Sequence, residues 1–133
     1  GWYKGWFFRS LKELSYMINV IEKENLVWET AETKKYAIPY TDYNGRQRTY
    51  YADFIVNNKT IIEVKPKKLI FSKAIQTKVQ AAKVFAQTIG LEYDILEPAQ
   101  ISDKQIVELY KSKMLVFTKR YEKKYMERFG AVL

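Results

Sequence analysis

The segment at residues 51–65 constrains the fold of this chain most, because two apolar strand-like runs flank a short polar turn. β-Branched and aromatic residues on both sides of the turn predict two antiparallel strands, a β-hairpin. Three charged side chains interrupt the apolar runs: Asp53 in the first, and Glu63 and Lys65 in the second. A charge within an apolar strand requires a compensating partner or a function.

The length of the turn decides whether these charges share one face of the hairpin. A two-residue turn places Asp53 opposite Ile62, and therefore on the other face from Glu63. A three-residue turn at residues 57–59 instead pairs Asp53 with Glu63 and Phe54 with Ile62. We predict the three-residue turn, or an equivalent bulge, because it groups charges with charges and apolar residues with apolar residues.

Two carboxylates on one face suit a hard divalent cation, and a neighbouring ammonium group suits a phosphate. The hairpin therefore indicates metal-assisted cleavage of a phosphodiester bond. The chain contains no histidine and no cysteine, which excludes the usual zinc hydrolases, nucleophile–histidine systems and disulfides. Any chemistry must rest on carboxylates, Lys, Tyr or a metal.

Length and charge are compatible with this hypothesis. We expect a single domain at residues 1–133. Lys plus Arg number 23 against 15 for Asp plus Glu, and the net charge of +8 favours an anionic partner such as nucleic acid or a lipid surface. No apolar run approaches the ~20 residues of a membrane span, so we expect no membrane partner. The lack of cysteine fits a reducing cytoplasm.

The pattern along the chain predicts an α/β fold of order α-β-β-β-α-β. Ser10 and Ser72 are candidate helix N-caps, Gly90 a helix stop, and residues 42–45 a tight turn. The expected elements are a helix at 10–23, strands at 27–38, 48–56 and 60–65, a helix at 72–89, a strand at 91–96 and a helix at 102–129. The crossover through the second helix makes the last strand parallel to the third.

The spacing of Asp53, nine residues, and Glu63-x-Lys65 resembles the PD-(D/E)XK nuclease superfamily. Within it, the chain is similar to TnsA-type transposon endonucleases and phage head-completion nucleases. The motifs that carry this resemblance are Phe8-Arg9-Ser10-x2-Glu13, Ile38-Pro39-Tyr40, Gly45-Arg46-x-Arg48-x-Tyr50-x2-Asp53-Phe54 and Ile62-Glu63-Val64-Lys65-Pro66-Lys67-Lys68. Ala52 stands where the family usually has proline. The resemblance implies a restriction-endonuclease-like core at about 9–97, a mixed sheet flanked by helices, with a C-terminal helical extension at about 102–129.

The same resemblance implies a divalent-metal-dependent DNA endonuclease of phage or mobile-element origin. We expect a cytoplasmic protein, in the host cytoplasm if it is phage-encoded. Asp53 and Glu63 would bind the metal together with the backbone carbonyl of Val64. Lys65 would orient the attacking water or stabilise the transition state, and Glu13 would add a ligand, often through water. Mg²⁺ is the expected ion, with Mn²⁺ as a substitute.

Each candidate also has a purely structural interpretation. Glu13 is the fourth residue of a Ser-x-x-Glu capping box, which explains it as well as catalysis does. Asp53 could be a turn acid, and Glu63 and Lys65 the solvent face of an amphipathic strand. We favour the site because all these residues occur together with the upstream pattern.

Further residues are candidates for contacting DNA, although a solvated basic loop and an exposed polar helix face would look the same. They are Arg46, Arg48, Lys67, Lys68, Gln76, Gln80 and Lys83. The alternatives for the whole protein are a non-catalytic basic nucleic-acid-binding module and a phage assembly protein. One site cuts one strand, so cleavage of both strands requires a homodimer, repeated nicking or a partner nuclease.

Overall fold

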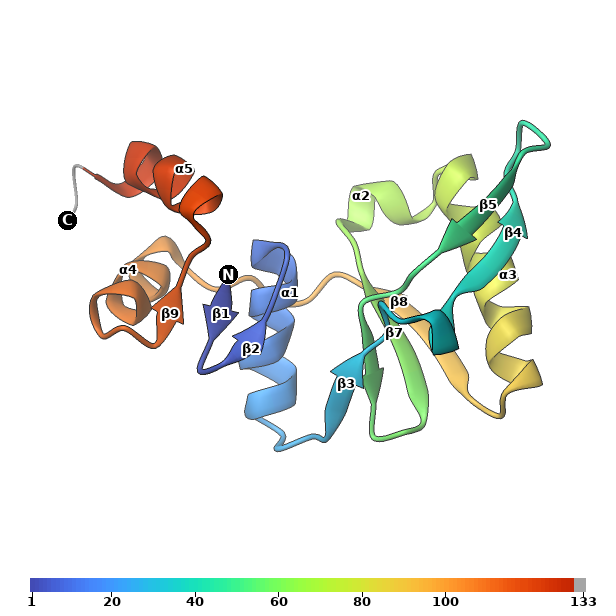
Figure 1. The fold of residues 1–133 in the computed structure, drawn as a ribbon, viewed down its shortest axis with the longest axis horizontal. Helices are drawn as coiled ribbons and strands as arrows, with labels where there is room; N and C mark the ends of the chain where they lie inside the picture. The colour runs from blue at the N-terminus through green and yellow to red at the C-terminus, as the bar shows by residue number, and fades with distance from the viewer. Residues whose placement is uncertain (131–133) are drawn as a thin grey trace.

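The computed structural model describes residues 1–130, which form a mixed α/β fold with a C-terminal helical pair (Figure 1). In chain order the elements are β1 (Trp2–Tyr3), β2 (Trp6–Phe7), α1 (Leu11–Tyr16), a π-helical segment (Met17–Glu22), β3 (Trp28–Thr30), a 3₁₀ turn (Lys34–Tyr36), β4 (Ile38–Thr41), β5 (Gln47–Tyr50), β6 (Phe54–Val56), β7 (Thr60–Val64), α2 (Lys67–Ile70), α3 (Lys73–Thr88), β8 (Glu92–Leu96), α4 (Asp103–Lys111), β9 (Leu115–Val116) and α5 (Lys119–Phe129).

A four-stranded mixed sheet of order β3-β6-β7-β8 forms the centre of the fold. β6 pairs antiparallel with β3 and β7, whereas β7 and β8 are parallel and joined through α3. The elements that build this sheet follow the predicted order α-β-β-β-α-β. The prediction of a mixed sheet flanked by helices is therefore confirmed.

Alternation along β6 and β7 assigns their side chains to two different cores. Phe54 and Ile62 face α1 and pack with its buried stripe, which includes Leu14. Ile55 and Ile61 face the opposite side, where α3 and the β4–β5 hairpin cover them. Residues at odd positions of β7 therefore point toward the α3 side of the sheet.

The turn between β6 and β7 has the predicted length of three residues. Phe54 pairs with Ile62, and Val56 pairs with Thr60, which leaves residues 57–59 as the turn. Asn57 and Asn58 adopt positive φ angles of 55° and 52°, a conformation that asparagine tolerates better than most residues. The predicted register of the hairpin is confirmed.

Two predicted strands are wrong in their extent. The strand expected at 48–56 is interrupted after Tyr50, because β5 leaves the central sheet and pairs with β4. The strand expected at 27–38 ends at Thr30, and the polar residues that follow form a loop and a 3₁₀ turn before β4. Both interruptions result from tertiary packing: Ala31 and Ala52 are fully buried where the chain changes direction.

The helix expected at 102–129 is also wrong, because it is two helices separated by β9. Lys113 has a φ of 64° and ends the first helix, and Leu115 is buried in β9, which pairs with β1. Tyr125 and Phe129 of α5 are buried in the same aromatic core as Phe8. Among residues 1–130, no helix is both long and apolar enough to cross a membrane.

Candidate active site

Asp53 lies immediately before β6 and is fixed by three hydrogen bonds. Its N–H donates to the Ile62 carbonyl at 3.0 Å, and its own carbonyl accepts from the Ala31 N–H at 3.2 Å. Its Oδ2 accepts a hydrogen bond from the Val64 N–H at 2.8 Å. These contacts hold the Asp53 carboxylate beside β7, which is the strand that carries Glu63 and leads into Lys65.

Glu63 is 7% exposed, and two tyrosines stand behind it. The Tyr50 hydroxyl donates a hydrogen bond to Glu63 Oε2, and the Tyr50 and Tyr93 hydroxyl oxygens lie 3.0 Å apart. Burial, followed by the charge of Glu63, raises the pKa of Tyr50 far above its usual range. Tyr50 therefore stays protonated and acts as a donor to the carboxylate at every relevant pH.

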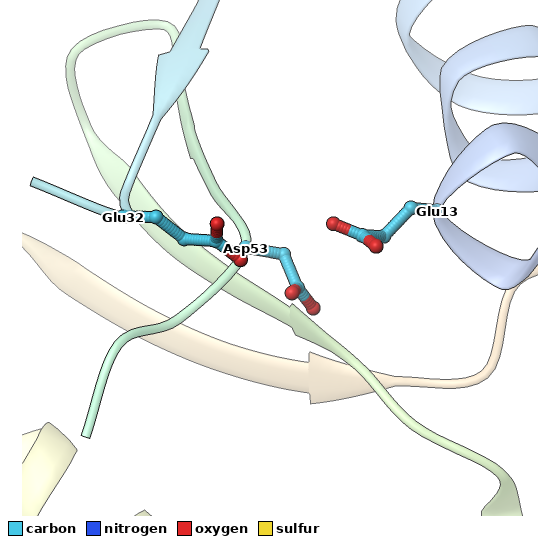
Figure 2. Close-up of side chains that lie close together, drawn as sticks. All are labelled: Glu13, Glu32 and Asp53. Atoms are coloured by element: carbon cyan, nitrogen blue, oxygen red, sulfur yellow. The ribbon is translucent and has the colours of Figure 1, made fainter. Parts of the chain in front are cut away.

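Glu13 takes part in the N-terminal cap of α1, and its carboxylate also lies close to that of Asp53. Its N–H donates to Ser10 Oγ at 3.1 Å, so Ser10 caps the helix, while its Oε2 accepts from the Arg9 N–H at 3.1 Å. The same carboxylate faces Asp53 and is only 7% exposed (Figure 2). Burial, and then the charge of Asp53, raise the pKa of Glu13 to about 7.

Glu32 joins this group, and the sequence did not reveal it. Carboxylate oxygens of Glu13, Glu32 and Asp53 all lie within 4.8 Å of one another, although the residues come from α1, the loop after β3 and the start of β6 (Figure 2). Glu32 also forms an ion pair with Arg9. The available signal was an acid in the polar middle of an apolar segment, but nothing in the sequence paired that segment with Asp53.

The electrostatics of this cluster favour a cation. Burial, and then the adjacent Glu63 carboxyl group, raise the pKa of Asp53 well above its usual range. Holding several carboxylates together away from water costs several kcal/mol per charge unless an opposite charge compensates. Mg²⁺ and Mn²⁺ prefer hard oxygen ligands, and a group of carboxylates supplies such oxygens together with negative charge. The residues present therefore fit a divalent metal.

Two adjoining cavities give access to the group. One, of about 530 Å³, is lined by Glu63, Lys65 and Tyr50, and the other, of about 290 Å³, by Glu13 and Asp53. Arg9 and Glu32 line both cavities. Lys65 and Glu63 therefore line the same cavity, whereas Asp53 and Glu13 line the other.

The cationic side chains that line the larger cavity are mostly not those expected from sequence. They are Arg9, Lys34, Lys65 and Lys78, of which we predicted only Lys65 as a functional residue. Lys78 also lies over the Tyr50 ring, with Nζ at 5.7 Å from its centroid. Lys78 was not predicted because it lies beside the apolar stripe of α3, whereas the candidates on this helix lie on the opposite, polar stripe.

The seven residues expected to contact DNA lie outside the lining of this cavity. Arg48 is paired with Asp42 at 3.0 Å within the β4–β5 hairpin, and the Gln76 Nε2 donates to the Ile70 carbonyl at 2.8 Å. The remaining five are exposed side chains: Arg46 on the hairpin, Lys67 and Lys68 on α2, and Gln80 and Lys83 on α3.

Comparison with known protein families agrees with this geometry. The family model of the TnsA-like endonuclease N-terminal domain matches residues 18–97, more than half of the chain. The chain belongs to this TnsA-like endonuclease family. The match contains Asp53, Glu63 and Lys65 but begins after Glu13, so the position of Glu13 rests on the structure alone. No curated protein and no solved structure matches the chain.

Proposed function

We propose that this TnsA-like domain is a divalent-metal-dependent DNA endonuclease that hydrolyses phosphodiester bonds. The observation that supports this most is the three-residue turn of the β6–β7 hairpin, which places Asp53 against β7 with its carboxylate bonded to the Val64 N–H. Glu63 lies on β7, Lys65 directly follows that strand, and both line one cavity. Membership of a nuclease family supports the same activity.

The residues that would hold the metal are Asp53, Glu63 and the backbone carbonyl of Val64, with Glu13 and Glu32 as additional ligands, directly or through water. A bound Mg²⁺ or Mn²⁺ supplies a Lewis acid for the phosphate oxygens and lowers the pKa of water. The Val64 N–H orients Asp53 Oδ2, while Tyr50 orients Glu63. These contacts fix the carboxylates before the substrate arrives, which is how metal ligands are kept in a productive geometry.

Lys65 acts on the reacting phosphate. From the larger cavity its ammonium group orients the attacking water and stabilises the negative charge that develops on the phosphate oxygens. Water attacks phosphorus and loses a proton to solvent, the bond from phosphorus to the leaving sugar oxygen breaks, and that oxygen takes up a proton from solvent. No covalent enzyme intermediate forms. Arg9, Lys34 and Lys78 attract the phosphate to the same cavity.

DNA beyond the cut phosphate extends over the exposed flanks of the site. Arg46, Arg48, Lys67, Lys68, Gln76, Gln80 and Lys83 contact it there, mainly through its backbone. A homodimer or a partner nuclease then cuts the second strand. A phage or mobile-element setting, in the host cytoplasm, belongs to the same proposal.

The activity is tested by nicking of supercoiled plasmid in Mg²⁺ or Mn²⁺, with excess chelator as the negative control. We expect nicking by the wild type and none by Asp53→Ala or Lys65→Ala, provided that circular dichroism shows both to be folded. Glu108→Ala and Lys111→Ala are the controls: they remove the same two kinds of charge from exposed positions of α4, and both variants should cut normally. Binding of DNA without any cleavage would instead indicate a non-catalytic nucleic-acid-binding module.

A further inference from the structure

A second feature of this chain lies directly after Lys65, on the short helix α2. Phe71, the residue that follows α2, is 81% exposed, the highest value among the exposed large apolar side chains of the described residues. Leu69, on the same turn, is 43% exposed. Burying an aromatic ring is favourable by roughly 1.5–3 kcal/mol relative to leaving it in water, so Phe71 could contribute to binding any partner that covers it.

The backbone that carries Phe71 is held firmly. Its neighbour Ile70 is buried, and the Ile70 carbonyl accepts the 2.8 Å hydrogen bond from Gln76. The Lys67 N–H donates to Glu97 Oε2 at 3.1 Å, and the Ser72 N–H donates to the Leu69 carbonyl at 3.1 Å. Phe71 is therefore presented to solvent on an ordered turn, and Gln76 has a structural role in presenting it.

The charge around Phe71 identifies the class of partner. Lys67, Lys68 and Lys73 lie within four residues of it, and all three are exposed. α2 begins two residues after Lys65, which follows β7 and lines the larger cavity. In Figure 1, α2 lies at that end of the central sheet. An apolar ring among ammonium groups suits a polyanion that also presents flat apolar faces. Nucleic acid with unpaired bases has this combination, because aromatic side chains stack on bases while lysines contact the backbone.

We propose that Phe71 stacks on an unpaired base of the DNA strand next to the cut phosphate, with Lys67 and Lys68 on the adjoining backbone. The inference rests on the proposed endonuclease function. Bases inside an intact duplex are already stacked on one another, so the ring gains a partner only where pairing is interrupted. The substrate is therefore DNA with a bubble, a flap or an unpaired end, in preference to a continuous duplex.

The test is a fluorescence-anisotropy titration of the full chain in chelator, where no cutting occurs. Two labelled probes are compared, a continuous duplex and the same duplex with a central unpaired bubble. We expect the wild type to prefer the bubble, and Phe71→Ala to lose about tenfold in affinity for the bubble but little for the duplex. Phe71→Trp should retain the preference, because the indole ring also stacks.

Two further variants separate stacking from general effects. Val84→Ala replaces a residue of α3 that is 62% exposed, and it should bind both probes as the wild type does. Lys68→Ala should weaken binding to both probes and reduce the salt dependence, as loss of a phosphate contact does. Because these side chains are exposed, the variants should fold normally, and circular dichroism checks this.

The inference is overturned if Phe71→Ala binds both probes like the wild type. It is also overturned if the wild type has no preference for the bubble. Plasmid nicking is measured separately. A wild type that nicks plasmid but shows no effect of Phe71→Ala refutes the stacking alone, whereas Phe71-dependent binding without cutting of either plasmid or the bubble probe in Mg²⁺ or Mn²⁺ refutes the endonuclease alone.

Discussion

The Tyr50 hydroxyl donates a hydrogen bond to Glu63 Oε2, and the two residues belong to different sheets. Tyr50 ends β5 in the two-stranded sheet, whereas Glu63 lies on β7 in the central sheet. The contact exists because the chain turns after Tyr50 instead of continuing into β6. The β4–β5 hairpin thus positions a carboxylate that it does not itself carry.

Tyr50→Phe removes this hydrogen bond while keeping the ring in its core. We expect Mn²⁺ affinity to fall by about 10- to 100-fold, the usual effect of losing a partner that orients a metal ligand. Isothermal titration calorimetry measures the change. Tyr43→Phe, at an exposed position of the β4–β5 turn, is the matched control and should leave the affinity unchanged. If Tyr50→Phe and the wild type bind Mn²⁺ with equal affinity, Tyr50 does not position Glu63 for metal binding.

Glu13→Gln tests the electrostatic crowding of the site without metal. The pKa of Glu13 rises from an ordinary value near 4.5 to about 7 on folding. The folded state therefore binds more protons than the unfolded state in this window, and Glu13 makes the protein less stable as pH rises from about 4.5 to 7. The free energy of unfolding of Glu13→Gln should exceed that of the wild type by on the order of 3 kcal/mol at pH 8, and the two should be almost equal below pH 4.

Urea unfolding in chelator at several pH values measures this difference. Glu108→Gln, at an exposed position on α4, provides a control with the same change in charge and should show no such pH dependence. A constant difference between Glu13→Gln and wild type across the pH range would contradict the raised pKa.

Metal binding should release protons. Burial and neighbouring carboxylates raise the pKa values of Glu13 and Asp53, and a metal requires both groups ionised. We expect Mn²⁺ affinity to increase from pH 6 to pH 8, with a binding enthalpy at pH 7 that depends on the ionisation enthalpy of the buffer. Calorimetry in Pipes and in Tris, two buffers with different ionisation enthalpies, detects this dependence. An enthalpy that is the same in both buffers would exclude proton release.

Substitutions of Lys78 and Lys83 test whether DNA binds at the larger cavity or along the exposed face of α3. Lys78 lines the larger cavity, whereas Lys83 is exposed one and a half turns further along the helix. Lys78→Ala should weaken DNA binding more than Lys83→Ala and lower the slope of the salt dependence by about 1. Binding titrations at several salt concentrations give both quantities. A larger effect of Lys83→Ala would indicate that the DNA backbone binds along the exposed face of α3 and not at the cavity.

The hairpin register was predictable from sequence because it depends on local pattern. Only a three-residue turn pairs Phe54 with Ile62, and Asn57 and Asn58 suit its backbone conformation. The parallel placement of β8 followed in the same way from the crossover through α3. In both cases the information lies within a short stretch of chain.

The rest of the site depends on contacts between distant segments. Glu32 joins Glu13 and Asp53 only because β3 pairs with β6, and no local pattern specifies that pairing. The break after Tyr50 is hard to predict because β-branched and aromatic residues lie on both sides of it, at 49–51 and 54–56. For α4 and α5 a signal was present, since the apolar run that includes Leu115 and Phe117 does not fit a helical period.

The most direct test of the central claim is the anomalous difference density of Mn²⁺ in crystals soaked with the ion. We predict one strong peak within bonding distance of carboxylate oxygens of Asp53 and Glu63, with Glu13 and Glu32 reached directly or through water, and no such peak in crystals of Asp53→Ala. A soaked crystal whose Mn²⁺ peaks all lie away from Asp53 and Glu63 would contradict the proposed metal site, and with it the proposed mechanism.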